Sequence, residues 1–532
     1  MNNNKNLLNY LPIICVIFLI AGLLLGKFLY QKNLSSIPVF SSYSRGKVDE
    51  VIENIIENYV DSVNEKEITD YAITSLLAHL DPHSSYIPPQ KVKAEQERMN
   101  GKFEGIGIEF RIIDDTLMVV NTIKGGPSEK AGILSGDRII GLNKQKISFG
   151  KLETDSLVKL LRGKSGSNVD LIIKRPFKEG EIDIAVTRGE IPIFSIDAQI
   201  MLNKNVGYIK INRFSYQSHQ EFKTAATTLQ KRGASNLIID VRDNPGGSLN
   251  SVVKICDELL ENGKNIVYTK GENDRETYNS KYDGNFKNMN LVVLTNQNSA
   301  SASEILAGAL QDNDKATIVG RRTFGKGLVQ AVLKLSDNSR INLTISRYYT
   351  PSGRCIQKPF EKDKIDLYHS EEIKRWENGE LYSKDSIKFN DSLQFKTLNG
   401  RTVYGGGGII PDEFVGLDTS MNSSLLFEIL SKDLIKNYAI KFFTARKIKG
   451  DTYKEADNNF PQKKMLTAFK LFCESKEVFG TDKDWITSKK YISNKLSAYI
   501  LRVKFGNNGY FKKVAEMDSD IIKALEIFTS KN

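Results

Sequence analysis

The sequence has few residues that bind soft metals and no long run of like charges. Its four cysteines, Cys15, Cys256, Cys355 and Cys473, are far apart and lack CxxC spacing, and only four histidines accompany them. A disulfide framework and a zinc site are therefore not predicted. The net charge of +11 arises from 75 Lys and Arg interleaved with 64 Asp and Glu. Because no block of five or six like charges occurs, the composition argues against nucleic-acid binding.

What is present describes an ordinary globular protein of several domains. The chain has 532 residues, of which 40% are hydrophobic and 26% charged. This length exceeds what one hydrophobic core supports and predicts about three or four domains. Neither repeats of fixed period nor low-complexity tracts occur, and the composition does not indicate long disorder.

The amino-terminal end contains one long apolar segment. The twenty residues 7–26 carry no charge, which is enough to cross a bilayer core of about 30 Å. The segment is therefore a membrane helix or a signal sequence. No A-x-A cleavage site follows, and Lys27 comes directly after it, which favours an uncleaved anchor. Basic residues flank both ends, so the charge rule does not give an orientation.

The rest of the chain divides by its hydrophobic pattern into regions that predict a mixed α/β (α+β) fold. Residues 48–59 show a helical stripe, and residues 205–314 alternate apolar strands with helical stretches, which is typical of βαβ units with a parallel sheet. The predicted regions are a signal anchor at 1–32, a helical region at 41–98, a strand-rich domain at 100–190, an αβ core at 195–416 and a helical region at 417–532. Within the core, the polar segment 361–397 is expected to be an exposed excursion.

The stretch "SASASEILAGALQD" places three serines, Ser299, Ser301 and Ser303, between an apolar strand and a helical pattern. A residue in this position lies at the carboxyl edge of a parallel sheet, where open α/β folds bind ligands and where free N–H groups can hold an oxyanion. Serine is also a favoured helix N-cap. This stretch alone therefore leaves a nucleophile and a plain helix start open.

A nucleophilic serine requires a base, and the four histidines offer weak choices because each fits a surface or structural position. The Ser-x-x-Lys spacing is absent as well. Lys326, between Gly325 and Gly327 in "GRRTFGKGLVQ", remains, although a solvated turn lysine fits that stretch too. To act near neutral pH, its pKa must fall by about 3 units, or about 4 kcal/mol, which burial can supply. Gln330 could orient the amine without adding a negative charge.

With these serine and lysine stretches, the chain resembles the carboxyl-terminal processing proteases, or tail-specific proteases, which use a Ser-Lys dyad. The matching stretches run in the family's order from residue 80 to 412: "LDPHSSY", "LIIDVRDNPGG", "SASASEILAGALQD", "RRTFGKGLVQ", "RYYTPSGRCIQ" and "GGGGIIPD". The resemblance implies a serine endopeptidase with Ser301 as nucleophile, Lys326 as base and Gln330 as the assisting residue. It also implies oxyanion-hole amides at Gly246, Gly247 and Ala302.

The resemblance further assigns residues 100–190 to a PDZ domain that precedes the catalytic core. Such a domain binds an extended chain end as an added strand. The peptide-binding residues are carried to Gly105, Ile106, Gly107 and Ile108 of "GIGIEF". A simple β-hairpin start is the alternative interpretation of this stretch.

The expected partners are protein or peptide substrates with apolar carboxyl termini, and the membrane through the amino-terminal segment. The reaction needs no metal and no organic cofactor. The resemblance also implies a bacterial inner-membrane location with the catalytic part in the periplasm, and a homodimer through the helical regions, although the stripe at 48–59 fits an intramolecular contact equally. Two rival functions remain: a catalytically inert PDZ-containing binding or tethering protein on the same scaffold, and a membrane-attached assembly factor built on the helical ends.

Overall fold

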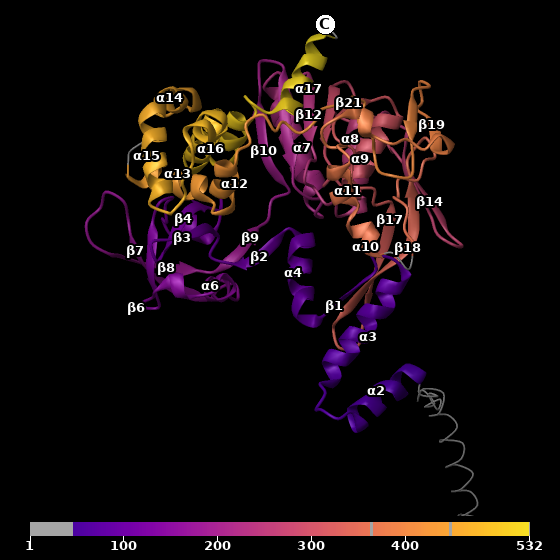
Figure 1. Ribbon diagram of the computed structural model, residues 1–532, viewed down its shortest axis with the longest axis horizontal. Coiled ribbons are helices and arrows are strands. Elements are labelled where there is room, and N and C mark those ends of the chain that lie inside the picture. The colour runs from indigo at the N-terminus through magenta and orange to yellow at the C-terminus, as the bar shows by residue number, and fades with distance from the viewer. Residues whose placement is uncertain (1–45, 362–364, 446–449, 531–532) are drawn as a thin grey trace, which may run out of the picture. The chain divides into compact units, whose positions relative to one another are not determined.

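The computed structural model describes residues 46–361, 365–445 and 450–530 (Figure 1). The chain divides into two compact units, with the boundary between residues 76 and 77. The smaller unit contains α2 (Lys47–Asn58) and most of α3 (Glu65–Leu80), and every residue of α2 is at least partly exposed. No helix within the described ranges is both long and apolar enough to cross a bilayer. The segment predicted as an anchor, residues 7–26, lies outside these ranges.

The larger unit begins with an antiparallel domain that spans residues 102–192. Its main sheet has the strand order β3–β4–β5–β7–β8, with β6 paired to β5, and β2 pairs with β9 across the entry and exit of the domain. The strands and helices are β2 (Lys102–Gly105), β3 (Ile108–Ile113), β4 (Thr116–Thr122), α5 (Pro127–Lys130), β5 (Arg138–Leu142), β6 (Gln145–Lys146), α6 (Thr154–Leu161), β7 (Asn168–Lys174), β8 (Ile182–Thr187) and β9 (Gly189–Pro192). Leu117, Val119, Leu171 and Ile173 share its core.

The αβ core is built on a six-stranded sheet with the order β10–β11–β12–β15–β16–β21. Neighbouring strands from β11 to β21 are parallel, and β10 is antiparallel to β11. The strands are β10 (Ile196–Met201), β11 (Val206–Ile211), β12 (Asn236–Asp240), β15 (Asn290–Thr295), β16 (Ala316–Gly320) and β21 (Glu413–Phe414). The predicted parallel sheet is therefore confirmed.

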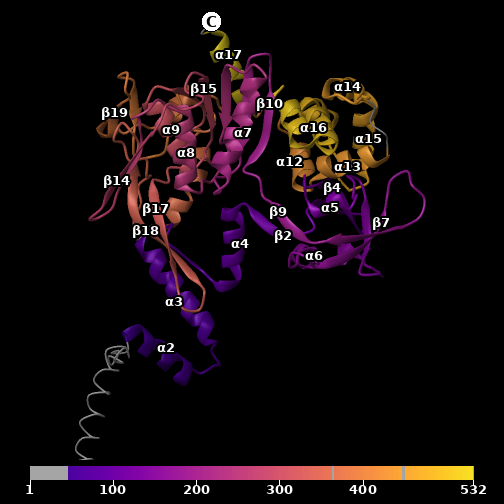
Figure 2. The ribbon, with the colours of Figure 1, turned by 180° about the vertical axis from the view of Figure 1, so that it is seen from behind.

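Helices cover both faces of this sheet, because alternate strand residues point to opposite sides. Ile239 and Val293 pack against α7 (Ser218–Lys231), α8 (Leu249–Leu259) and α9 (Ala302–Asp312). Ile238 and Val292 pack against α17 (Ser519–Ser530) on the other face. Figure 2 shows α7, α8 and α9 together beside the sheet.

A second sheet contains the strand that begins directly after the loop of Lys326, here called the lysine loop. Its order is β1–β18–β13–β14, and β17 pairs with β18 as a long hairpin. These strands are β1 (Ser85–Ile87), β13 (Asn265–Lys270), β14 (Arg275–Asn279), β17 (Leu328–Lys334) and β18 (Arg340–Tyr349), and α4 (Pro89–Asn100) follows β1.

The expectation that residues 361–397 form an exposed excursion is wrong in part. The segment contains α10 (Ile365–His369), α11 (Glu371–Glu377) and β19 (Gln394–Lys396), which pairs with β20 (Thr402–Tyr404). Tyr368, Arg375 and Glu380 are buried. Some of the charged residues that gave the segment its polar pattern form ion pairs with the core instead of facing water, because Glu380 pairs with Arg322 at 2.6 Å.

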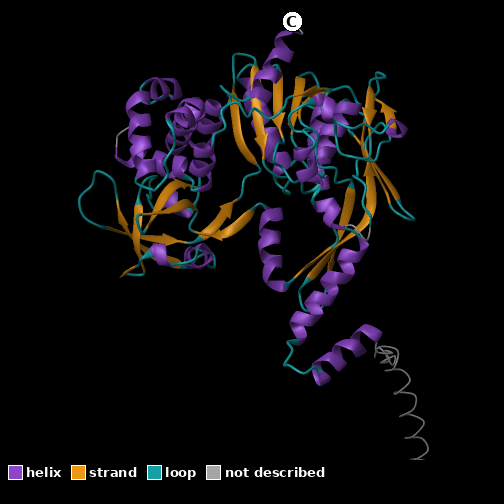
Figure 3. Cartoon of the chain, viewed as in Figure 1, coloured by secondary structure: helices purple, strands orange, loops and turns teal. Residues whose placement is uncertain are grey.

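The carboxyl-terminal region is helical, as its pattern predicts (Figure 3). Its helices are α12 (Ser424–Ser431), α13 (Leu434–Ala445), α14 (Tyr453–Asn458), α15 (Gln462–Glu474), α16 (Asp482–Val514) and α17. A core that includes Leu425, Met465, Phe469 and Leu496 holds α12 to α16 together as a bundle.

Candidate active site

The three serines at the start of α9 have different environments. The hydroxyl of Ser299 donates to the Val241 carbonyl and that of Ser303 to the Asn244 carbonyl, each at 2.8 Å, and both serines are fully buried. Ser301 instead lines a cavity of about 820 Å³. Of the three, Ser301 is therefore the serine that a molecule in the cavity would meet.

Ser301 is held in an unusual backbone conformation at the start of α9. Its φ is 55° and its ψ is −114°, a region that costs a non-glycine residue about 1–3 kcal/mol and that is found at functional sites. Its N–H donates to Oε2 of Glu304 at 2.8 Å. Gly246 lies so close that a Cβ there would be 2.7 Å from the Ser301 Cβ. The strained turn is thus supported from two sides.

The "RDNPGG" turn follows β12, the strand next to β15, so it meets the serine turn at the carboxyl edge of the sheet. Buried Asn244 donates to the Ile211 carbonyl at 3.1 Å and accepts the Gly246 N–H at 2.9 Å. The N–H groups of Gly247 and Ala302 make no hydrogen bond with another described residue, and both residues line the cavity with Ser301. Two of the three predicted oxyanion amides are therefore available, while that of Gly246 is occupied.

Lys326 lines the same cavity as Ser301 and Gln330. Its amine donates to Oε1 of Gln330 at 3.2 Å. Burial lowers the pKa of Lys326 below its ordinary value, and the negative charges of Asp81 and Glu304 partly oppose that fall. Among the hydrogen bonds of the described residues, none joins Lys326 to Ser301. In this structure the amine is engaged by the glutamine rather than by the serine.

Glu304 ties the serine turn to the lysine loop. This fully buried carboxylate accepts the N–H of Ser301 at 2.8 Å, that of Gly325 at 2.7 Å and that of Lys326 at 2.9 Å. The Thr323 hydroxyl donates to it at 2.6 Å. Burial raises the pKa of Glu304, although these hydrogen bonds favour its charged form.

Tyr348, from β18, forms a second bridge between the two loops. Its hydroxyl lies 2.6 Å from the Lys326 carbonyl oxygen and 3.0 Å from the Ser301 carbonyl oxygen. Both bridges act on backbone atoms. The relative position of Ser301 and Lys326 is therefore fixed at the main chain.

The "LDPHSS" turn supports Gln330 from the other side. Asp81 accepts the N–H groups of His83 and Ser84, each at 2.8 Å, and the Thr344 hydroxyl at 3.2 Å. This turn directs the His83 carbonyl at the side-chain amide of Gln330, which donates to it. Partial burial raises the pKa of Asp81, but its hydrogen bonds with Ser84 and His83 outweigh that effect and leave it below the ordinary value.

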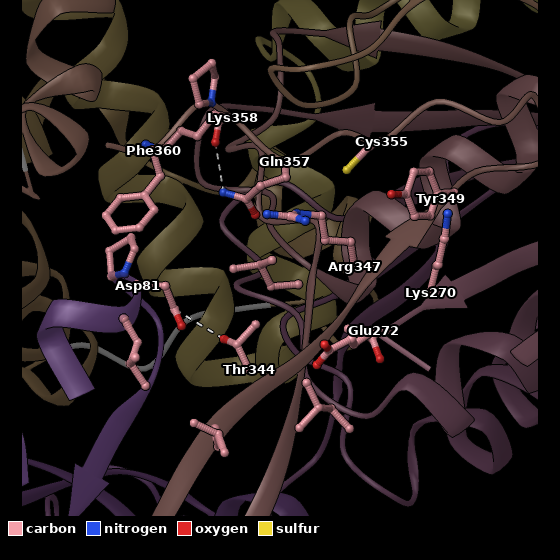
Figure 4. A pocket seen from close by; sticks show the side chains of 18 residues that line it. Asp81, Lys270, Glu272, Thr344, Arg347, Tyr349, Cys355, Gln357, Lys358 and Phe360 are labelled. Atoms are coloured by element: carbon pink, nitrogen blue, oxygen red, sulfur yellow. Dashed lines mark hydrogen bonds between the residues drawn. The ribbon is translucent and has the colours of Figure 1, made fainter. Parts of the chain in front are cut away.

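A second cavity, of about 890 Å³, adjoins this turn. Figure 4 shows Asp81, Thr344 and Gln357 among its lining residues, with the hydrogen bond from Thr344 to Asp81. Leu328 lines both cavities. The Asp81 turn therefore contacts the second cavity through Asp81 and Pro82, and the Lys326–Gln330 pair through the His83 carbonyl.

The predicted peptide-binding residues of the 102–192 domain lie apart from this site. Gly105 ends β2, Gly107 has a φ of 76°, and Ile108 begins β3. Buried Ile106 accepts the Ser128 N–H at 2.9 Å through its carbonyl. The four residues form the turn that leads into β3, and none lines the cavity of Ser301. As for metals, the described residues contain no group of three or more His, Cys, Asp or Glu suited to hold one.

The fold and the site define an α/β protein with a serine and a half-buried lysine at one cavity, preceded by a small antiparallel domain. Comparisons with known proteins agree with that class. Residues 205–365 match peptidase family S41, residues 105–186 match the PDZ domain, and residues 425–506 match a family of unknown function, DUF8443.

Two relatives are similar to this chain over about 60% of its length. A carboxy-terminal-processing protease of Bartonella bacilliformis is 32% identical over 64% of this chain and 80% of its own length. The carboxy-terminal processing protease CtpB of Bacillus subtilis is 35% identical over 59% of this chain and 65% of its own length. A solved photosystem II D1 C-terminal processing protease is 24% identical, covers 69% of this chain and 92% of that chain, and has a TM-score of 0.35.

The chain belongs to the carboxy-terminal processing proteases of peptidase family S41, and it is a serine-type peptidase with a PDZ domain.

Several residues that hold the site were missed by the sequence analysis. Asn244, Glu304 and Tyr348 act through buried hydrogen bonds to loops that are distant in the chain. Only Glu304 carried a readable signal, because Ser301 and Glu304 have the S-x-x-E spacing of a capping box. The "LDPHSS" motif was quoted for the resemblance, but nothing in its letters places the His83 carbonyl beside Gln330.

Proposed function

We propose that this chain is an endopeptidase that cleaves near protein carboxyl termini, with Ser301 as the nucleophile and Lys326 as its base. The observation that carries the proposal is the contrast among the serines. Ser299 and Ser303 are buried and bonded to backbone carbonyls, while Ser301 shares a cavity with Lys326 and Gln330. A serine nucleophile paired with a lysine base needs a neutral amine, and burial of Lys326 favours that form.

In the proposed mechanism the Lys326 side chain leaves Gln330 and approaches Ser301. The neutral amine takes the hydroxyl proton as the oxygen attacks the scissile carbonyl, and it then gives a proton to the leaving amine. Water hydrolyses the acyl-enzyme through the same steps.

The amides of Gly247 and Ala302 are the favoured oxyanion donors, because both residues line the cavity and neither N–H has an acceptor among the residues that the structure describes. Gly246 contributes differently. Its N–H donates to Asn244, and its missing Cβ leaves room for Ser301.

The PDZ domain is proposed to select substrates by their chain ends. An apolar carboxyl terminus would add as a strand to β3, with its carboxylate at the turn of Gly105, Ile106, Gly107 and Ile108. The sequence of residues 7–26 supports attachment to a membrane, and a bacterial periplasmic location for the catalytic part is proposed with it. The homodimer through helical regions stays a prediction.

Peptide cleavage by single-serine variants of the full chain tests the dyad. With a peptide that ends in apolar residues, Ser301→Ala is expected to abolish turnover, with loss of at least about a thousandfold in kcat. Ser303→Ala is the matched control, because it removes a buried hydroxyl only two residues away, in the first turn of α9, and should keep most of the activity. Equal activity of the two variants would reject Ser301 as the nucleophile.

A further inference from the structure

Strand β4 of the PDZ domain is buried on both faces. Leu117 and Val119 point into the PDZ core, as one face of a strand should. The alternate residues Met118 and Val120 are also buried, at 0% and 3% exposure. The outer face of the sheet is therefore covered, and the sequence "LMVV" is apolar at every position for that reason.

The carboxyl-terminal bundle provides this cover. Met118, Val120 and Ile113 form one buried cluster with Ile440 of α13 and Val503 of α16. Ile440 and Val503 do not belong to the core of the bundle itself, and Met118 and Val120 do not belong to the PDZ core. The cluster is thus a separate interface between the two domains.

Two ion pairs also connect the bundle to β3. Arg502 pairs with Glu109 through both terminal guanidinium nitrogens, at 2.9 and 3.0 Å. Arg111 donates to Asp433 and to Asn437, each at 3.1 Å. Glu109, Arg111 and Ile113 alternate with Ile108 and Phe110, which pack against the PDZ core. β3 is the strand proposed to accept substrate. The bundle therefore contacts β3 on the face that points away from the PDZ core.

The same bundle is attached to the catalytic core. After a break in α16 at Gly506, the Asn508 side chain accepts the Gln199 N–H of β10 at 2.9 Å. Farther on, Arg242 of the core pairs with Asp518 at 2.9 Å and with Asp520 at 2.8 Å. One continuous segment, residues 502–520, thus reaches from the PDZ domain to the core.

We propose that residues 425–506, which match a family of unknown function, are a docking module for the PDZ domain of this chain. The module binds the back of β3 and β4 and holds the domain at a fixed place relative to the core. This role rests on the proposed function of the PDZ domain. A substrate tail bound there is then presented to Ser301 at a high effective concentration, whereas a freely moving domain would dilute it.

The interface can be broken without touching the dyad. Ile440→Lys places a charge in the buried cluster of the full-length chain. Leu471→Lys is the matched control, because Leu471 lies on α15 of the same bundle with 62% exposure. Hydrogen exchange of residues 108–122 and 434–445 measures docking, and KM for two peptides, one with an apolar carboxyl-terminal tail and one without it, measures presentation.

Ile440→Lys is expected to speed exchange in both segments and to raise KM for the tailed peptide by about tenfold, while cleavage of the untailed peptide is unchanged. Leu471→Lys should match the wild type. If the two variants behave alike, or if Ile440→Lys increases turnover, the docking role is overturned. Cleavage of the untailed peptide reports on the proposed dyad alone, so its absence in the wild type would count against the dyad and not against the module.

A charge exchange keeps the test valid if Ile440→Lys does not fold. Glu109→Arg and Arg502→Glu should each loosen the interface, and the double variant should restore wild-type exchange and KM. Additive effects in the double variant would contradict a direct contact between β3 and α16.

Discussion

The Lys326 amine donates a hydrogen bond of 3.2 Å to Oε1 of Gln330, while its own backbone N–H donates to Glu304 at 2.9 Å. The glutamine offers the amine an oxygen without a charge. Gln330 therefore orients the Lys326 amine but adds little to the stability of the protonated amine. This matters because an amine that is protonated at neutral pH cannot accept the proton of the serine. The hydrogen bond from Gln330 to the His83 carbonyl fixes which amide atom faces the lysine.

A negative charge at position 330 should weaken the base by keeping it protonated. Gln330→Glu is nearly isosteric and is expected to raise the pKa of Lys326, which moves the acidic limb of the kcat/KM profile to higher pH. Gln330→Met removes the oxygen without adding charge and should lower kcat with no such upward movement. An unchanged acidic limb in Gln330→Glu would contradict a titrating base at Lys326.

Asp81 should affect the same limb in the opposite direction. Its charge raises the pKa of Lys326 against the larger lowering by burial. Asp81→Asn is therefore expected to lower that pKa further and to move the acidic limb to lower pH. His83→Ala keeps the backbone carbonyl that accepts from Gln330, so its profile should retain the wild-type limb. If Asp81→Asn reduces kcat but leaves the limb in place, Asp81 has only a structural role in the turn.

Glu304 is expected to be essential for the position of the dyad rather than for proton transfer. Glu304→Gln leaves one oxygen for four donors and should lower kcat by about a hundredfold through misplacement of the two loops. It should also destabilise the fold by about 1–3 kcal/mol, since buried N–H groups lose their acceptor. Kinetics at saturating peptide and chemical denaturation measure the two effects. Tyr348→Phe removes one bridging hydroxyl and should show a smaller loss of both.

The contact of Gly246 with the nucleophile gives a steric prediction. In Gly246→Ala the new Cβ would be 2.7 Å from both the Ser301 Cβ and the Ala300 carbonyl oxygen, at a φ of +102°. The serine turn must shift, and kcat should fall by about a hundredfold or more. Gly263→Ala is the control, because it also has positive φ but nothing within 4 Å of its Cβ. It should lose about 1 kcal/mol of stability and keep its activity.

The class of the fold could be predicted well from the sequence, because local patterns of strands and helices indicate it without knowledge of which strands pair. Strands such as "NLIID" and "LVVLT" are apolar runs next to helical patterns, and their alternation alone indicates a parallel sheet. Residues 361–397 were misjudged because composition does not show whether Arg375 and Glu380 meet water or each other. For the same reason, the sequence does not show that Arg502 of α16 pairs with Glu109 of β3.

For the candidate active site, short motifs were enough to single out a serine and a lysine as candidates, while the residues that support them depend on the tertiary structure. Ser301 and Lys326 lie in small-residue turns after strands, where local pattern is informative. Asn244, Glu304 and the His83 carbonyl act across separations of many residues, and no periodicity reports such contacts. The covered face of β4 was visible as "LMVV", yet the sequence could not say that α13 and α16 cover it.

The most direct test of the central claim is the pKa of the Lys326 amine in the folded full-length chain. Nitrogen-15 NMR of lysine-labelled protein can follow it through a pH titration, with Lys326→Arg to assign the signal. A midpoint below the ordinary lysine value of 10.5, and lower still in Asp81→Asn, is the expected result. A midpoint at or above 10.5 would contradict Lys326 as the base and with it the proposed mechanism.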